Sequence, residues 1–260
     1  MKLNRIDIKW ERFILLKLTI WGILLALFSV LRVHGSNQSL DDFISSAYGT
    51  INLSNVQNVI PVLIWMLPLL VLNFILGDYI DKQLNQHAVY IFTRTEKRKE
   101  WLTAQAISLF SYVIYFHILL QVFLVTFGYV SGFRALSPIT MWGNVVLGMI
   151  TFFLSNILAV FIINLLSLRM NTVPSAAFII AYQSVVLYLS GIMLKNSSSS
   201  YDLIKWFPLT QGVQGWDGYA EMRVSEFSLE GSLFALVYLV TALLIVYLIG
   251  LFVIQKRDFY

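Results

Sequence analysis

The chain lacks cysteine and is poor in charge. None of its 260 residues is cysteine, and Asp, Glu, Lys and Arg together make up only 12% of them. The absence of cysteine excludes disulfide bonds, thiolate metal ligands and cysteine nucleophiles. Soluble domains carry about 25% charged residues. The chain therefore has too little charge to cover the surface of a soluble protein of this length.

Several kinds of active site are also missing. The sequence has no H-E-x-x-H, G-x-S-x-G or G-x-x-x-x-G-K-[ST] motif, which excludes a zincin site, a serine nucleophile elbow and a P-loop for ATP. Its histidines, His34, His87 and His117, fall in three different predicted regions, so they do not predict a metal site. We predict that the chain is not an enzyme and binds no metal or cofactor of its own.

Apolar residues dominate instead. They form 58% of the chain, its mean hydropathy is +0.75, and a bilayer-spanning helix needs about 20 of them in succession. The runs are continuous rather than alternating, which favours helices over barrel strands. We therefore predict an all-α membrane protein, with residues 1–260 forming a single transmembrane domain. Its six predicted spans are roughly 13–33, 59–77, 104–130, 141–168, 173–194 and 233–253.

Cations are unevenly divided between the segments that connect these spans. Twelve fall on one side of the membrane: Lys2, Arg5, Lys9, Arg12, Lys82, Arg94, Lys97, Arg98, Lys99, Arg169, Lys256 and Arg257. Five fall on the other: Arg32, Arg134, Lys195, Lys205 and Arg223. The positive-inside rule places the first set, and both termini, in the cytoplasm. Six spans, an even number, agree with that assignment.

The connecting segments carry further signals. Residues 1–12 mix charged and apolar side chains, which is typical of an amphipathic helix at the membrane surface or of a disordered basic start. Residues 34–58 are predicted to be a polar outer loop. The cytoplasmic loop 78–103 contains the apolar piece "AVYIF" beside its cations. The outer loop 195–232 is rich in aromatic residues, which indicates short interfacial helices or an ordinary interfacial loop.

A few polar side chains fall inside the predicted spans, and no acidic residue lies near the middle of any of them. The absence of acids counts against a transporter coupled to protons or sodium. The polar residues have two interpretations, namely hydrogen bonds between helices or the lining of a transport pathway. His117 and Gln121 are spaced to share one helix face, as are Asn156 and Asn164. The candidate pathway residues are Asn73, His117, Gln121, Asn156 and Asn164.

The layout resembles the permease subunit of an ABC exporter of the ABC type-2 family. "MKLNRIDIKWER" is similar to that family's amphipathic connecting helix, and "YIDKQLNQHAVYIFTRTEKRKEWLTAQ" to its cytoplasmic loop with a coupling helix. The ending "FVIQKRDFY" is similar to the family's C-terminal pattern. Five residues match the stretch that leads into span three in the family: Thr93, Arg94, Lys97, Lys99 and Trp101.

The resemblance implies a function and partners. It implies a separate ATPase subunit that binds ATP and Mg, a second permease copy, and a place in the bacterial cytoplasmic membrane. The implied substrate is amphipathic or lipid-like, such as a peptide toxin or antimicrobial peptide. The residues implied to couple to the ATPase are Asp81, Leu84, Val89, Tyr90, Ile91, Phe92 and Arg94. The outer loop is implied to close the pathway, with Trp206, Phe207 and Trp216 as gate residues.

Two other functions fit the same residues. A stand-alone immunity protein would sequester a toxin without ATP, and its outer aromatic loop would then be sensitive to mutation while the cytoplasmic loop tolerated it. A secondary transporter or channel would work without any partner. Nothing in the charge pattern predicts a nucleic-acid partner, because in a membrane protein the distribution of cations reports orientation.

Overall fold

The computed structural model describes residues 11–33, 39–48, 59–85, 98–135, 138–196, 206–207, 211 and 229–256. The long elements are all helices: α1 (Arg12–Val33), α2 (Leu40–Tyr48), α3 (Val59–Leu76), α5 (Arg98–Val130), α6 (Pro138–Met170), α7 (Thr172–Asn196) and α9 (Leu229–Lys256). No strand occurs within these described ranges. The predicted all-α class is confirmed. The predicted amphipathic helix 1–12 lies almost entirely outside the described residues.

Within the described residues, six helical segments are long and apolar enough to cross a membrane, so the chain is a multi-span membrane protein. They follow the six stretches expected from hydropathy, but several helices are longer than the predicted spans. α5 begins at Arg98 rather than at 104 and contains 33 residues, which is about 50 Å of helix at 1.5 Å per residue. A hydrocarbon core is about 30 Å thick, so this helix extends well beyond it.

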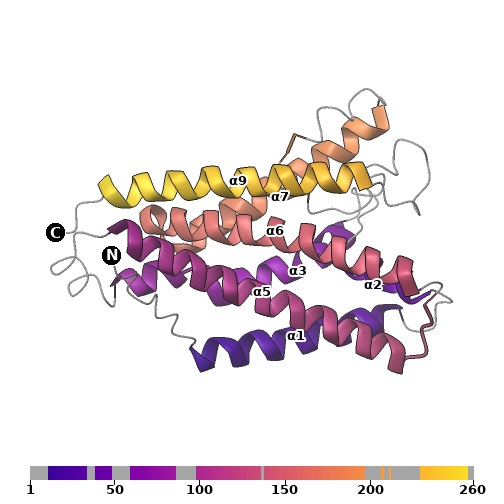
Figure 1. Ribbon diagram of the computed structural model, residues 1–260. Helices are drawn as coiled ribbons and strands as arrows, with labels where there is room; N and C mark the ends of the chain where they lie inside the picture. Colours follow the sequence, from indigo (N-terminus) through magenta and orange to yellow (C-terminus); the bar gives the residue numbers. More distant parts are fainter. Residues whose placement is uncertain are drawn as a thin grey trace.

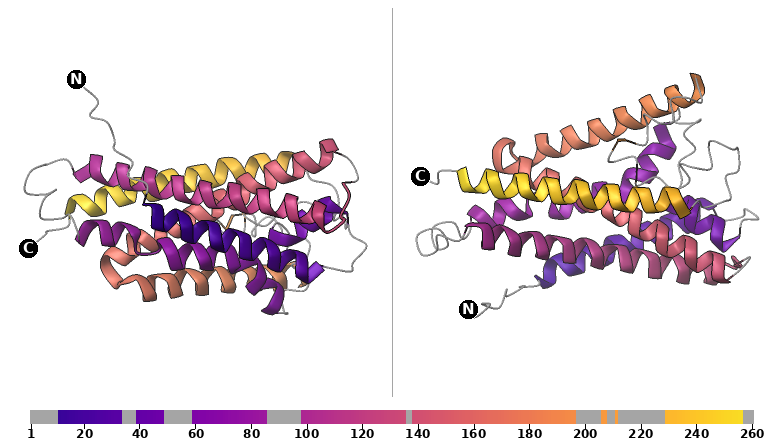
Figure 2. Two further views of the ribbon diagram at one scale, coloured as in Figure 1. Left: turned by 90° about the horizontal axis from the view of Figure 1, so that it is seen from below. Right: turned by 45° about the horizontal axis from the view of Figure 1, so that its top comes forward.

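The helices run lengthwise beside one another, with α6 at the centre of the packing (Figure 1). α6 contacts α2, α3, α5, α7 and α9, while α1 packs mainly along α5. Two further views show the same lengthwise arrangement (Figure 2). α1 and α5 begin, and α9 ends, at the same end of the bundle, on the left of Figure 1. We call this the cation-rich end, and its described cations include Arg12, Lys82, Arg98, Lys99 and Arg169.

The outer faces of the bundle are apolar. Large hydrophobic side chains stand exposed along α1, among them Leu16, Ile20 and Leu24, and along α9, among them Val237 and Leu248. Soluble monomers rarely expose patches of this extent. Both helices therefore present the surface expected against lipid tails.

One helix was not anticipated. Residues 34–58 were predicted to form a polar outer loop, yet they contain the amphipathic helix α2, whose Leu40, Phe43, Ile44 and Ala47 are buried. Ser39 caps this helix, since its hydroxyl accepts from the Asp42 N–H at 3.1 Å. The signal was present in the sequence as a capping serine followed by apolar residues at helical spacing, but the segment's polar composition hid it.

α2 is held against the end of α5. The Phe43 ring stacks on Phe133 with ring centroids 5.0 Å apart, and the Leu40 N–H donates to the Arg134 carbonyl at 3.0 Å. α5 ends at Val130. Gly132, two residues later, has a φ of +90°, which belongs to the left-handed region. The N–H groups of Gly132 and Phe133 close a Schellman motif onto the carbonyls of Tyr129 and Gly128. The turn thus places Phe133 where α2 packs.

The predicted orientation is testable by labelling, because the chain has no cysteine to give background. Lys99 lies at the cation-rich end and Arg134 at the opposite end, and both are exposed. We predict that a membrane-impermeant maleimide labels Arg134→Cys in intact cells but labels Lys99→Cys only after permeabilisation. The reverse pattern would invert the orientation inferred from the cations.

Candidate functional site

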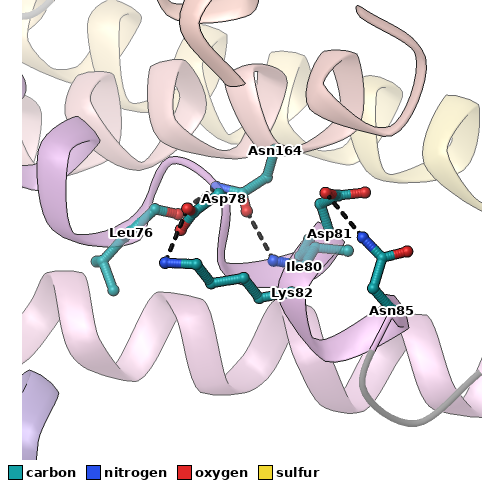
Figure 3. Close-up of polar contacts among 7 residues, drawn as sticks. All are labelled: Leu76, Asp78, Ile80, Asp81, Lys82, Asn85 and Asn164. Carbon is teal, nitrogen blue, oxygen red and sulfur yellow. Dashed lines mark hydrogen bonds and ion pairs between the residues drawn. The ribbon is translucent and has the colours of Figure 1, made fainter. Parts of the chain in front are cut away.

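The candidate site lies at the cation-rich end, where the second span is interrupted. α3 ends at Leu76, residues 77–78 form a turn, and residues 79–85 are helical again. Figure 3 shows this interruption with the side chain of Asn164 beside it. We call residues 79–85 the loop entry, because they form the first limb of the predicted cytoplasmic loop.

Asn164 of α6 is inserted into the interruption. In a continuous helix the Ile80 N–H would donate to the Leu76 carbonyl four residues earlier. Here the Ile80 N–H donates to Asn164 Oδ1 at 2.9 Å, and Asn164 Nδ2 donates to the Leu76 carbonyl at 2.7 Å (Figure 3). Asn164 is fully buried, and its Nδ2 also reaches the Val160 carbonyl at 2.9 Å. One side-chain amide thus replaces a backbone hydrogen bond of span two.

Gly77 makes the tight turn possible. A Cβ at this position would lie 2.5 Å from the Asn73 carbonyl oxygen and would also overlap Asn73 Oδ1. The Gly77 N–H meanwhile donates to the same carbonyl at 2.8 Å. No residue other than glycine fits this turn without displacing Asn73.

The loop entry is fastened to α1 and α5 as well as to α6. Gln83 Nε2 donates to Glu11 Oε1 at 2.9 Å, and the Glu11 N–H donates to the Tyr112 hydroxyl at 2.7 Å. The Tyr79 ring meets the Tyr112 ring edge to face, with centroids 5.7 Å apart. These contacts join the start of α1, the loop entry and α5 at one place.

The second limb of the same loop, the start of α5, is fastened to the end of α9. Arg98 Nη1 donates to the Gln255 carbonyl at 3.1 Å, and the Thr103 and Tyr247 hydroxyls are 2.7 Å apart. Residues 86–97 therefore join two limbs that are each held to the helix bundle.

The exposed side of the loop entry is polar. Lys82 Nζ lies 2.8 Å from Asp78 Oδ2, one helical turn apart, and Asn85 Nδ2 donates to Asp81 Oδ2 at 3.2 Å (Figure 3). Exposed pairs of this kind contribute about 0–1 kcal/mol. They matter more as an accessible charged surface than as a source of stability.

The residues predicted to couple to a partner divide into two groups. Asp81 lies half-buried on the loop entry, whereas Leu84 is 2% exposed and packs into the core. The prediction that Leu84 contacts a partner is therefore corrected, because its side chain faces the bundle and is not accessible. The others, Val89, Tyr90, Ile91, Phe92 and Arg94, lie outside the described residues.

The predicted pathway residues lie largely inside the bundle. His117 and Asn156 are 1% and 2% exposed, and Asn156 Nδ2 lies 3.3 Å from His117 Nε2. The His117 ring is edge to face with Phe116, Phe152 and Phe153. This arrangement, like that of Asn164, matches the alternative of hydrogen bonding between helices.

Two further pathway candidates are only partly buried. Gln121 lies one turn from His117 on α5, and its Oε1 has no hydrogen-bond partner in the described part of the chain. The same holds for Asn73 Oδ1, which lies against Gly77. Neither of these oxygen atoms accepts a hydrogen bond from the His117–Asn156 pair.

Of the residues predicted to form an outer gate, the structure describes Trp206 and Phe207. The Trp206 ring packs edge to face on Phe234 and Tyr238 of α9, and the Tyr238 hydroxyl donates to the Trp206 carbonyl. Trp206 is nevertheless 57% exposed. Phe207 is half-buried, and Trp216 lies outside the described residues.

Sequence reasoning missed the contacts that hold the loop entry. Asn164 was considered for the pathway, and Glu11, Gln83 and Tyr112 were not singled out. Their partners are 72 to 101 residues away along the chain. No spacing rule connects residues so far apart, so only a polar residue in an apolar run could have drawn attention to Asn164.

No group of three or more His, Cys, Asp or Glu that could hold a metal occurs among the described residues. No curated protein and no solved structure matches the chain significantly. Residues 22–260 match a protein family over most of the chain's length. The chain therefore belongs to the family described as "Protein of unknown function (DUF2705)".

Proposed function

We propose that this chain is the permease subunit of an ATP-driven exporter. The observation that carries the proposal is the anchoring of the two described segments that flank residues 86–97, namely 79–85 and the start of α5. One limb of that loop is held to α1, α5 and α6, and the other to α9. A push on the loop is then passed to several spans at once, which is what a partner ATPase needs in order to drive a membrane domain.

The two limbs reach different parts of the membrane domain. The Glu11 and Asn164 contacts connect the loop entry to both the outermost and the central helices of the bundle. Contacts with defined donors and acceptors transmit displacement better than lipid-facing apolar surfaces, because the latter slide without breaking a bond. Asp81 and the Asp78–Lys82 pair provide an exposed polar face on which a partner can dock.

ATP and Mg belong to the partner subunit in this proposal, and a second permease copy completes the transport pathway in the bacterial cytoplasmic membrane. The proposed substrate is an amphipathic or lipid-like molecule, most simply a peptide toxin or antimicrobial peptide. An apolar bundle with aromatic side chains and no intramembrane acid suits such a substrate better than an ion or a sugar.

The proposal is tested by purification from native membranes. We expect a nucleotide-binding subunit to co-purify with the tagged wild type and to be lost when Val89, Tyr90, Ile91 and Phe92 are all changed to serine. The eluates are compared by their ATPase activity. A control changes three apolar residues of the predicted outer segment 34–58, Ile51, Leu53 and Val56, to serine and should retain the subunit.

If no ATPase co-purifies with the wild type, the proposed exporter has no subunit that hydrolyses ATP. The stand-alone immunity and secondary-transport functions then become the working hypotheses. Loss of the ATPase from both variants would indicate general damage to the membrane domain and would contradict a specific role for the loop.

A further inference from the structure

We infer that span two has a second state in which α3 and the loop entry form one continuous helix, and that Asn164 is the positioning residue that holds the interrupted state. The inference concerns the chain alone and does not depend on a partner ATPase.

The backbone on both sides of the interruption is already helical. The Gly77 N–H donates to the Asn73 carbonyl, and the Lys82 N–H donates to the Asp78 carbonyl, each at 2.8 Å and each with helical spacing. Between them, the Ile80 N–H and the Leu76 carbonyl are not bonded to each other. Both are hydrogen-bonded to the Asn164 side chain instead. If Asn164 withdraws, these two groups are each other's natural partners.

Because the interruption is buried, the Ile80 N–H and the Leu76 carbonyl need a partner within the protein in either state. Ile80, Leu76 and Asn164 are all fully buried, so water is not at hand to satisfy an opened backbone pair. An unsatisfied backbone group in such a place is strongly unfavourable. Two arrangements satisfy both groups without water: Asn164 inserted, or a direct bond between Ile80 and Leu76. The element is therefore two-state rather than continuously adjustable.

Gly77 is consistent with both states. Its lack of a side chain permits the close approach to Asn73 that the interrupted state requires. Glycine is also a poor helix former, which disfavours the continuous state. Pro68 lies inside α3 more than two turns earlier, so it does not account for an interruption that begins after Leu76.

The two states differ in where the loop entry points. Asn85 lies eight residues beyond Gly77, which is about 12 Å along a helix. A change of about 25° in direction moves it by about 5 Å, and kinks of this size are usual where a side chain enters the helical ladder. A displacement of that size is measurable between two spin labels.

The experiment places spin labels on two introduced cysteines, with no native cysteine to interfere. The reporting pair is Asn85→Cys with Arg169→Cys, and the control pair is Lys99→Cys with Arg169→Cys, which joins α5 to α6 without crossing the interruption. Asn164→Leu removes the inserted amide while keeping a buried side chain of similar size. We expect it to shift the reporting distance by about 5 Å and to leave the control distance unchanged.

A second variant tests the inference independently, in case Asn164→Leu does not fold. Gly77→Ala adds a Cβ that the interrupted turn cannot hold but a regular helix can, and it leaves α6 untouched. We expect it to shift the reporting distance in the same direction. If the control distance also changes in Asn164→Leu, the Gly77→Ala result decides. An unchanged reporting distance in Gly77→Ala overturns the inference, as does an unchanged one in Asn164→Leu with an intact control distance.

Discussion

Replacing Asn164 by leucine is expected to lower the ATPase rate of the proposed permease–ATPase complex about tenfold while leaving the ATPase subunit bound. The variant leaves the Leu76 carbonyl and Ile80 N–H without their side-chain partner. A buried unsatisfied backbone group costs about 1–3 kcal/mol, and a shift of about 1.4 kcal/mol changes the ratio of two states tenfold. The loop entry is then misdirected even though its surface is unchanged.

The measurement compares co-purified ATPase and its turnover in lipid for wild type and variant. Asn156→Leu is the matched control, because it makes the same change on the same helix but removes a contact to His117 instead of to span two. We expect this control to retain most of the turnover. Equal losses in the two variants would mean that the bundle tolerates neither substitution, and the specific role of Asn164 would be abandoned.

Replacing Gly128 by alanine is expected to loosen α2 from the opposite end of the bundle. A Cβ at this position would lie 2.6 Å from Leu40 Cδ1 and 3.2 Å from the Phe43 ring. Both neighbours are 0% exposed and Phe43 is stacked on Phe133, so moving either side chain disturbs the buried face of α2. Overpacking of this kind typically costs about 1–3 kcal/mol. Opening of α2 is the least costly way to relieve it.

The readout is the accessibility of a cysteine introduced at Ala47, which is 1% exposed on the buried face of α2. We expect Gly128→Ala to raise the maleimide labelling rate of Ala47→Cys about tenfold, because local opening governs the exposure of such a group. The matched control is Gly22→Ala, where the nearest atoms to the new Cβ are 3.9 Å away. Equal labelling in the two backgrounds would show that α2 is not held through Gly128.

Much of the fold follows from local properties of the chain. Runs of apolar residues about as long as a bilayer is thick predicted the six candidate spans, because in lipid only a helix satisfies its own backbone. The cytoplasmic loop was predicted to start at residue 78, whereas the structure has a turn at 77–78 followed by helical residues 79–85. Helix ends were less predictable. α5 begins at Arg98, six residues before the predicted span, and Arg98 is held by its hydrogen bond to the Gln255 carbonyl near the far end of the chain.

The amino-acid sequence by itself determined that this is a multi-span helical membrane protein, and it predicted six spans with cations unevenly divided between the segments that connect them. Length, hydropathy and charge are local properties of a segment, and they decide directly whether that segment is more stable in lipid or in water. Only the tertiary structure decided that α2 packs inside the bundle, that Leu84 faces inward, and that Asn164 completes span two. Each of these depends on pairing between residues far apart in sequence. A buried amide bonds to whichever backbone group the packing places beside it, and that packing is a property of the tertiary structure.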